Sequence, residues 1–66
     1  MKITVNGRAR EVADGLNLAQ LLSEMKLDPR SLAVEHNQAI AERENFDTTI
    51  IEDGDRLEIV QFVGGG

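Results

Sequence analysis

One stretch of the 66-residue chain has the hydrophobic spacing of an amphipathic helix. Its apolar residues recur at intervals of three and four positions, so a helix would place them on one face. These residues are Leu18, Leu21, Leu22 and Met25. Asn17 is a suitable N-cap, and Gln20 stands three residues later, where it completes a variant of the capping box. Because a single apolar stripe covers one face of a sheet, the rest of the chain must supply that sheet.

A hairpin is predicted before the helix. Residues 1–5 alternate between polar and apolar side chains, as in a half-buried strand. Asn6 and Gly7 follow, and this pair is a strong hairpin signal because both residues tolerate positive φ. The returning segment, residues 8–12, alternates poorly, which either an edge strand or a bulge would explain.

Further short strands are expected after the helix. Pro29 disfavours helical backbone at Asp28, so we expect the helix to end near Leu27. Strands are then expected over residues 32–35, over a short segment that ends near Ile40, and over residues 56–63. The last of these is apolar on both faces, which fits a central position. The pattern predicts an α+β fold of the β-grasp (ubiquitin-like) type, a mixed four- to five-stranded sheet with one main helix packed on one face.

The composition excludes several classes of function. The chain has no cysteine, so it holds no disulfide, thiolate metal site or cysteine nucleophile. Its formal net charge of -5 would repel phosphate backbones, so we expect no nucleic-acid partner. No apolar run approaches the roughly 20 residues of a membrane span, and the first residues have the pattern of a strand rather than of a signal peptide. We therefore expect a soluble, cytoplasmic protein that binds no membrane.

Three consecutive glycines, Gly64, Gly65 and Gly66, follow the last predicted strand. Glycine loses the most backbone entropy on ordering, so we expect a folded domain over residues 1–63 and a flexible tail over residues 64–66. An arm without side chains can pass through a narrow channel into the active site of another protein. It also leaves the carboxyl carbon of Gly66 open to attack. A frayed terminus without function is the alternative.

Four segments of the chain carry a family resemblance. They are the Val5-Asn6-Gly7 hairpin, the helix from Leu18 to Met25, the Asp53-Gly54-Asp55 turn, and the ending Glu58-Ile59-Val60-Gln61-Phe62-Val63-Gly64-Gly65-Gly66. In these segments, and over essentially its whole length, the chain resembles the ThiS family, the sulfur carriers of thiamin biosynthesis. One segment departs from the family pattern, because Arg43 and Phe46 are present without the proline that many members carry before the arginine.

The resemblance implies a protein co-substrate rather than an enzyme. An E1-like (ThiF-like) adenylyltransferase would activate the carboxylate of Gly66 with ATP and magnesium, and sulfur would convert the acyl-adenylate to a thiocarboxylate. The tail, with Gly64 and Gly65, would then enter a ThiG-like thiazole synthase, which takes the sulfur for the thiazole ring of thiamin. The chain itself would bind no cofactor, and a free tail favours a monomer between these encounters.

Val60 and Phe62 are the candidate residues for docking to these partners. If the helix covers the other side of the sheet, they form an exposed apolar patch beside the tail; a covering loop is the alternative. His36 has no neighbouring nucleophile or second metal ligand in the sequence, so it is expected to be a surface turn residue. Arg8 and Arg10 either bind an acidic partner or protect an edge strand from pairing.

Two other functions stay open at this point. A carrier subunit of the molybdopterin-synthase type also ends in glycines, although the short chain and the Phe-Val-Gly-Gly-Gly ending argue against it. A β-grasp interaction module with an inert tail, or a tag conjugated to lysines, would belong to a different class. Deleting Gly66, or adding a residue after it, distinguishes them because a carrier then loses its activity whereas an interaction module binds as before.

Overall fold

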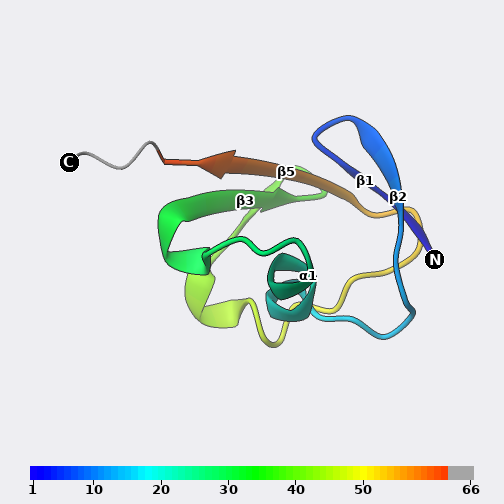
Figure 1. Cartoon of the computed structure of the whole chain (residues 1–66), viewed down its shortest axis with the longest axis horizontal. Coiled ribbons are helices and arrows are strands. Elements are labelled where there is room, and N and C mark those ends of the chain that lie inside the picture. The colour runs from blue at the N-terminus through cyan, green and yellow to red at the C-terminus, as the bar shows by residue number, and fades with distance from the viewer. Residues whose placement is uncertain (63–66) are drawn as a thin grey trace.

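A computed structural model describes residues 1–62, and residues 63–66 lie outside the described part. Within residues 1–62 the chain forms one five-stranded sheet, one α-helix and two short 3₁₀ helices (Figure 1). The strands are β1 (Lys2–Val5), β2 (Arg8–Glu11), β3 (Leu32–His36), β4 (Ala39–Ala41) and β5 (Arg56–Gln61). The helices are α1 (Leu18–Glu24), η1 (Pro29–Ser31) and η2 (Arg43–Asn45).

The sheet is mixed, with its strands in the order β2-β1-β5-β3-β4. β1 and β5 run parallel, whereas the other neighbouring strands are antiparallel. β5 therefore lies at the centre, as its two apolar faces predict. β2 lies at an edge, and its register with β1 is unbroken from Lys2 opposite Glu11 to Val5 opposite Arg8. The poor alternation of residues 8–12 thus reflects an exposed edge strand rather than a bulge.

The N-terminus of α1 has the predicted capping box. Asn17 Oδ1 accepts a hydrogen bond from the backbone N–H of Gln20 at 2.7 Å, and Gln20 Oε1 accepts one from the backbone N–H of Asn17 at 2.9 Å. Two of the N–H groups that a helix start leaves without partners are satisfied in this way. The apolar stripe of the helix then points inward, and Leu18, Leu21 and Leu22 are fully buried.

The C-terminus of α1 is formed by a Schellman motif. Lys26 adopts a left-handed conformation with φ 59°, and its N–H donates to the carbonyl oxygen of Ser23. The N–H of Leu27 donates to the carbonyl oxygen of Leu22, which completes the motif. α1 therefore ends at Glu24, three residues before the predicted end near Leu27. The left-handed residue stops the helix before the downstream proline can act.

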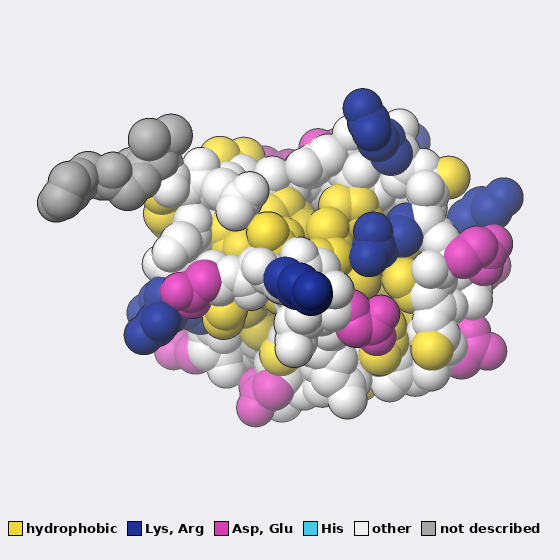
Figure 2. Space-filling view, in the orientation of Figure 1, with side chains coloured by type: hydrophobic (Ala, Val, Ile, Leu, Met, Phe, Trp, Pro, Cys, Tyr) yellow, Lys and Arg dark blue, Asp and Glu magenta, His cyan; other side chains and the backbone are white. Residues whose placement is uncertain are grey.

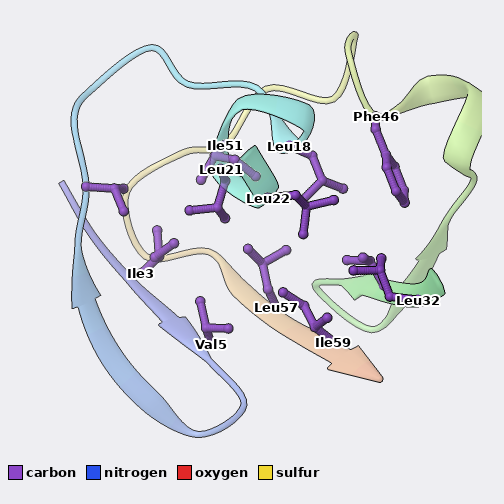
Figure 3. Packing of buried hydrophobic residues seen from close by; sticks show 12 residues of the cluster. Ile3, Val5, Leu18, Leu21, Leu22, Leu32, Phe46, Ile51, Leu57 and Ile59 are labelled. Atoms are coloured by element: carbon purple, nitrogen blue, oxygen red, sulfur yellow. The ribbon is translucent and has the colours of Figure 1, made fainter. Parts of the chain in front are cut away.

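The core lies between α1 and one face of the sheet (Figure 3). In Figure 3, Leu57 and Ile59 of β5 point toward Leu22 of α1. Removing such aliphatic side chains from water contributes about 1.5–3 kcal/mol each, so this cluster holds the domain together. The cluster consists of Ile3, Val5, Val12, Leu18, Leu21, Leu22, Leu32, Val34, Phe46, Ile51, Leu57 and Ile59. The sheet and its single helix confirm the predicted β-grasp fold.

Candidate functional site

The predicted reactive residue, Gly66, and the predicted insertion residues, Gly64 and Gly65, lie outside the described residues. The predicted boundary between domain and tail, at residue 63, lies outside them as well. The structure describes the strand that leads into this segment, and that strand, β5, ends at Gln61. The geometry available for the site is therefore that of β5 and its surroundings.

β5 is hydrogen-bonded on both sides. It pairs with β1 on one side and with β3 on the other, where the pairing continues to Gln61 opposite Leu32. Beyond the strand, the backbone N–H of Phe62 donates to the carbonyl oxygen of Ser31 at 2.8 Å. The backbone is thus anchored up to Phe62, the last residue that the structure describes.

The turn between β1 and β2 adds a further anchor. Asn6 and Gly7 have φ 51° and 81°, as the hairpin signal predicts. The Asn6 side chain reaches across to β5, where Oδ1 accepts a hydrogen bond from the N–H of Ile59 at 2.7 Å. Its Nδ2 donates to the carbonyl oxygen of the same residue at 3.1 Å. The sequence pattern predicted the turn but carried no sign of this contact, which joins residues far apart in the chain.

Val60 and Phe62 are both exposed, at 61% and 59% of their surface. Val60 lies opposite Ala33 of β3, on the sheet face that α1 does not cover. Ile40 of β4 lies on that same outer face by the alternation of side chains, and it is 66% exposed. Among residues 1–62 no loop covers this patch, so the accessibility that docking requires is present. Docking itself stays a prediction.

Two carboxylates lie on the same outer face. Glu35 and Glu58 are direct cross-strand partners of β3 and β5, and both are exposed. Like charges in directly opposite positions destabilise a sheet, so this pair is unfavourable in the isolated domain. A partner surface that offers basic side chains next to apolar ones would relieve this repulsion while covering Val60.

His36 is not the surface turn residue that the sequence analysis expected. It is the last residue of β3, and its Nε2 lies 2.7 Å from Oδ2 of the buried Asp55. The carboxylate of Asp55 also accepts hydrogen bonds from Asn37 Nδ2 at 3.1 Å and from the N–H of Glu52 at 2.8 Å. Because an ionised carboxylate can only accept, the proton in this contact belongs to His36 Nε2.

The hydrogen bonds of Asp55 also set its acidity. Burial by itself would raise the pKa of Asp55, but the hydrogen bonds from His36, Glu52 and Asn37 outweigh burial and hold this pKa below its usual value. Asp55 directly precedes β5, whereas Phe62 follows the other end of the strand. The network therefore secures the fold at the end of β5 that lies away from the glycine tail.

Neither a metal-binding cluster nor a membrane-spanning helix is found among the described residues. Within residues 1–62, no three His, Asp or Glu side chains lie together in a way that could hold a metal ion. In the same part of the chain, no helix is both long enough and apolar enough to cross a membrane. The structural features that bear on function are therefore the anchored β5 strand and the outer face beside it.

A mixed sheet whose last strand lies at its centre, with one helix across one face, defines the ubiquitin-like β-grasp class. Comparison with known proteins narrows this class to one family. The ThiS family profile matches residues 3–66, and the chain belongs to that family. The resemblance seen in the sequence is thereby confirmed.

Two relatives match the chain over its whole length. The crystal structure of the thiamine biosynthesis protein (ThiS) from Geobacter metallireducens has a TM-score of 0.86 and 43% sequence identity, with 100% of both chains covered. The sulfur carrier protein ThiS of Escherichia coli (strain K12) is 32% identical over 66 residues, which is 100% of both proteins.

A second kind of relative is much longer. The thiazole synthase of Paramagnetospirillum magneticum is 39% identical over 66 residues, and that of Magnetococcus marinus is 35% identical. These matches cover 100% of this chain, but the chain spans only 20% of the length of either thiazole synthase. Each of these two proteins therefore contains a segment similar in sequence to this chain.

Proposed function

We propose that this chain is a sulfur carrier of thiamin biosynthesis that acts as a protein co-substrate and has no catalytic site of its own. The observation that carries the proposal is the anchoring of β5. This central strand is held on both sides and leads, through Phe62, directly into Val63 and three glycines. A rigid body would thus present an arm without side chains, and the chain belongs to a family of which one relative is named a sulfur carrier.

The proposed chemistry takes place at the carboxylate of Gly66. A terminal carboxylate has a pKa of about 3.3–3.7 and is ionised at neutral pH, so its carbon resists nucleophiles. An E1-like adenylyltransferase would let a carboxylate oxygen attack the α-phosphorus of ATP, with magnesium bound, and pyrophosphate would leave. Hydrosulfide would then add to the acyl carbon, AMP would depart with its bonding electron pair, and a thiocarboxylate would result.

The proposed acceptor of the sulfur is a thiazole synthase. The similarity between this chain and a segment of two proteins with that name supports the pairing. It also favours thiamin biosynthesis over a carrier of the molybdopterin-synthase type. The use of cytosolic ATP by the activating partner makes a cytoplasmic location part of the same proposal.

The outer face of the sheet is the proposed docking surface for these partners. Val60 and Phe62 supply exposed apolar area next to the tail, and Glu35 and Glu58 supply negative charge. A partner enzyme with an apolar pocket and basic side chains around it fits this combination. Docking on this face would bring the segment after Phe62 to the partner's active site.

The experiment that tests the proposal is the intact mass of the protein after incubation with ATP, magnesium, an E1-like adenylyltransferase and sulfide. The expected result is the replacement of one oxygen by sulfur, mapped by fragmentation to the peptide that contains Gly66. An unchanged mass, with the enzyme active on a known carrier, would overturn the proposal and favour an interaction module with an inert tail.

Variants of the last residue make this experiment specific. Deletion of Gly66 alters none of the described contacts, so the fold is expected to persist while the thiocarboxylate is lost. Gly66→Ala keeps the carboxylate and adds a methyl group at the point of attack, so a slower reaction is expected. A modification that survives both changes unaltered would show that the mass change arises elsewhere in the chain.

A further inference from the structure

A groove lies between β2 and the end of α1, on the helix side of the sheet. It has a volume of about 350 Å³ and is lined by Val5, Asn6, Arg8, Ala9, Arg10 and Met25. Val5 is buried and Met25 is half-buried, so the floor of the groove is apolar. Figure 2 shows hydrophobic side chains reaching the surface of this face with Lys and Arg side chains around them. We call this feature the β2–α1 groove.

The charge of the β2–α1 groove is opposite to that of the chain. The chain carries a net charge of -5, yet the groove is lined by two arginines and by no carboxylate. Arg8 and Arg10 lie opposite Val5 and Ile3 in the register, which places both arginines on the helix side of β2. Both are exposed, and within residues 1–62 neither forms an ion pair. Lys26, which follows Met25, is exposed as well.

The backbone of β2 is also available for pairing. The N–H and C=O groups of Val12 both bond to Met1, which makes these two residues a hydrogen-bonded pair. Such pairs alternate with non-bonded pairs along an antiparallel ladder. Counting back from Val12, the backbone groups of Ala9 and Glu11 therefore point away from β1, toward the open edge. An added strand would find two donors and two acceptors there.

We propose that the β2–α1 groove binds an extended acidic peptide segment of a partner protein, which adds to β2 as an edge strand. Every second side chain of the peptide would lie on the helix side, over Val5 and Met25 and next to the arginines. Carboxylates at these positions form cross-strand pairs with Arg8 and Arg10, and arginine binds carboxylate in two-pronged geometry. The side chains between them point to the outer face of the sheet, because side chains alternate along a strand.

Charge argues against a second copy of this chain as the occupant. In antiparallel pairing of two β2 strands, the outward residues allow three registers: Ala9 opposite Ala9, Ala9 opposite Glu11, or Glu11 opposite Glu11, and the last of these opposes two carboxylates directly. The first register places Arg10 opposite Arg8 of the second copy, and the second places Arg10 opposite Arg10. Like charges in directly opposite positions destabilise a sheet, so β2 accepts an acidic strand but disfavours itself.

The groove is separate from the proposed docking surface. Val60 lies on the outer face of the sheet, whereas the groove opens on the helix side, and β2 is separated from β5 by β1. A partner bound in the groove therefore leaves the outer face free. The carrier could be held by one protein at β2 while an enzyme acts on its tail.

The test is an NMR titration of the isotopically labelled full chain with a short capped peptide of alternating aspartate and valine. The expected result is saturable shift changes at residues 8–11 and at Met25, with slower amide exchange at Ala9 and Glu11. A matched peptide of alternating lysine and valine is expected not to bind. Absence of saturable binding by the acidic peptide, equal binding of both peptides, or shift changes centred on Val60 would each overturn the proposal.

Variants test the two halves of the proposal separately. Arg10→Gln is expected to weaken peptide binding by about two- to fivefold, the worth of one opposite-charge cross-strand pair. Arg56→Gln makes the same charge change on the outer face and is expected to leave binding unchanged. Ala9→Pro removes an outward N–H without removing a bond to β1, and it is expected to weaken binding about fivefold or more. Equal binding by wild type and Arg10→Gln would overturn the proposal even if Ala9→Pro did not fold.

Discussion

The side chain of Asn6 takes the place of a backbone partner for Ile59. The parallel pairing of β1 with β5 places Val5 opposite Leu57, and the N–H of Asn6 donates to the carbonyl oxygen of Leu57 at 2.9 Å. There β1 turns away into the hairpin, and the Asn6 amide makes the next two hydrogen bonds of the ladder, both with Ile59. The turn residue thus extends the support of β5 to the residue directly before Val60.

The first prediction concerns this contact. Asn6→Gly keeps the positive φ that the turn requires but removes both side-chain hydrogen bonds. We expect a loss of about 1–3 kcal/mol in the free energy of unfolding, because the N–H and C=O of Ile59 lose their partner. Urea denaturation measures this loss. Amide exchange at Ile59 should also accelerate, whereas exchange at Val34 on the opposite strand should change only with global stability.

The corresponding control is Gly7, the second residue of the same turn. Nothing lies near the position where a Cβ would stand, so Gly7→Asn tests the turn conformation without removing a contact to β5. Asparagine adopts positive φ more readily than other residues with a side chain, but φ 81° still strains it, so a loss of stability smaller than that of Asn6→Gly is expected. If the two variants lost equal stability, the contact between Asn6 and Ile59 would contribute nothing beyond the turn itself.

The second prediction concerns the pH dependence of stability through Asp55. Its folded-state pKa is held below the usual aspartate value of about 3.9 by hydrogen bonds to the ionised form. The stabilisation is therefore present above that value and is lost as the pH falls through the folded-state pKa. Asp55→Asn should lower stability at neutral pH and flatten its decline in acid. Urea midpoints of both proteins between neutral pH and strong acid test this, and parallel curves would contradict it.

The third prediction concerns the hairpin between β3 and β4. Asn37 and Gln38 have φ 51° and 72°, so both turn residues are left-handed and neither is glycine. Asn37 is supported by its bonds to Asp55 and to the N–H of Arg56, but no such bond is found for Gln38 among residues 1–62. Gln38→Gly should therefore raise the free energy of unfolding by about 1 kcal/mol. A lower thermal midpoint of Gln38→Gly would contradict the interpretation that the left-handed backbone of Gln38 is strained.

The fourth prediction concerns the outer face. Phe62→Asp should weaken binding to the adenylyltransferase or to thiazole synthase while the fold survives, because Phe62 is 59% exposed and absent from the core. Truncation at the centre of a docking surface costs about 2 kcal/mol or more when the residue is a main anchor. The matched control is Ile50→Asp, since Ile50 is 54% exposed and lies outside the strands of the sheet. Calorimetric titration should separate the two variants; equal affinities would argue against docking at Phe62.

Local patterns predicted the elements well because their causes are local. The apolar spacing and the reciprocal caps of Asn17 and Gln20 depend on residues at most a few positions apart, and both are present in the structure. The Asn6-Gly7 turn follows from backbone preferences of two residues. The helix end was predicted wrongly, near Leu27 instead of at Glu24. The helix ends because Lys26 adopts a left-handed conformation, and lysine is not a residue type that marks such a position in a sequence.

The features of the candidate site also fall into two groups, those predicted from local sequence patterns and those that only the paired strands create. The three glycines after residue 63 and the apolar residues Val60 and Phe62 were visible as sequence patterns. The contact of His36 with Asp55 was missed, because a turn and a strand end that are 19 residues apart meet only once β3 and β5 are paired. The choice between an edge strand and a bulge at residues 8–12 likewise needed the strand order.

The sequence by itself determined one helix, a set of short strands and a glycine ending, since periodicity and turn chemistry act over a few residues. Only the tertiary structure decided that β1 and β3 are the strands that flank β5, that Asn6 binds Ile59, and that the groove beside β2 is basic. These features join residues distant in sequence, and their energies arise only when the strands pair and the helix covers one face. The physical reason is that hydrophobic spacing specifies which face is buried, whereas packing specifies what lies against it.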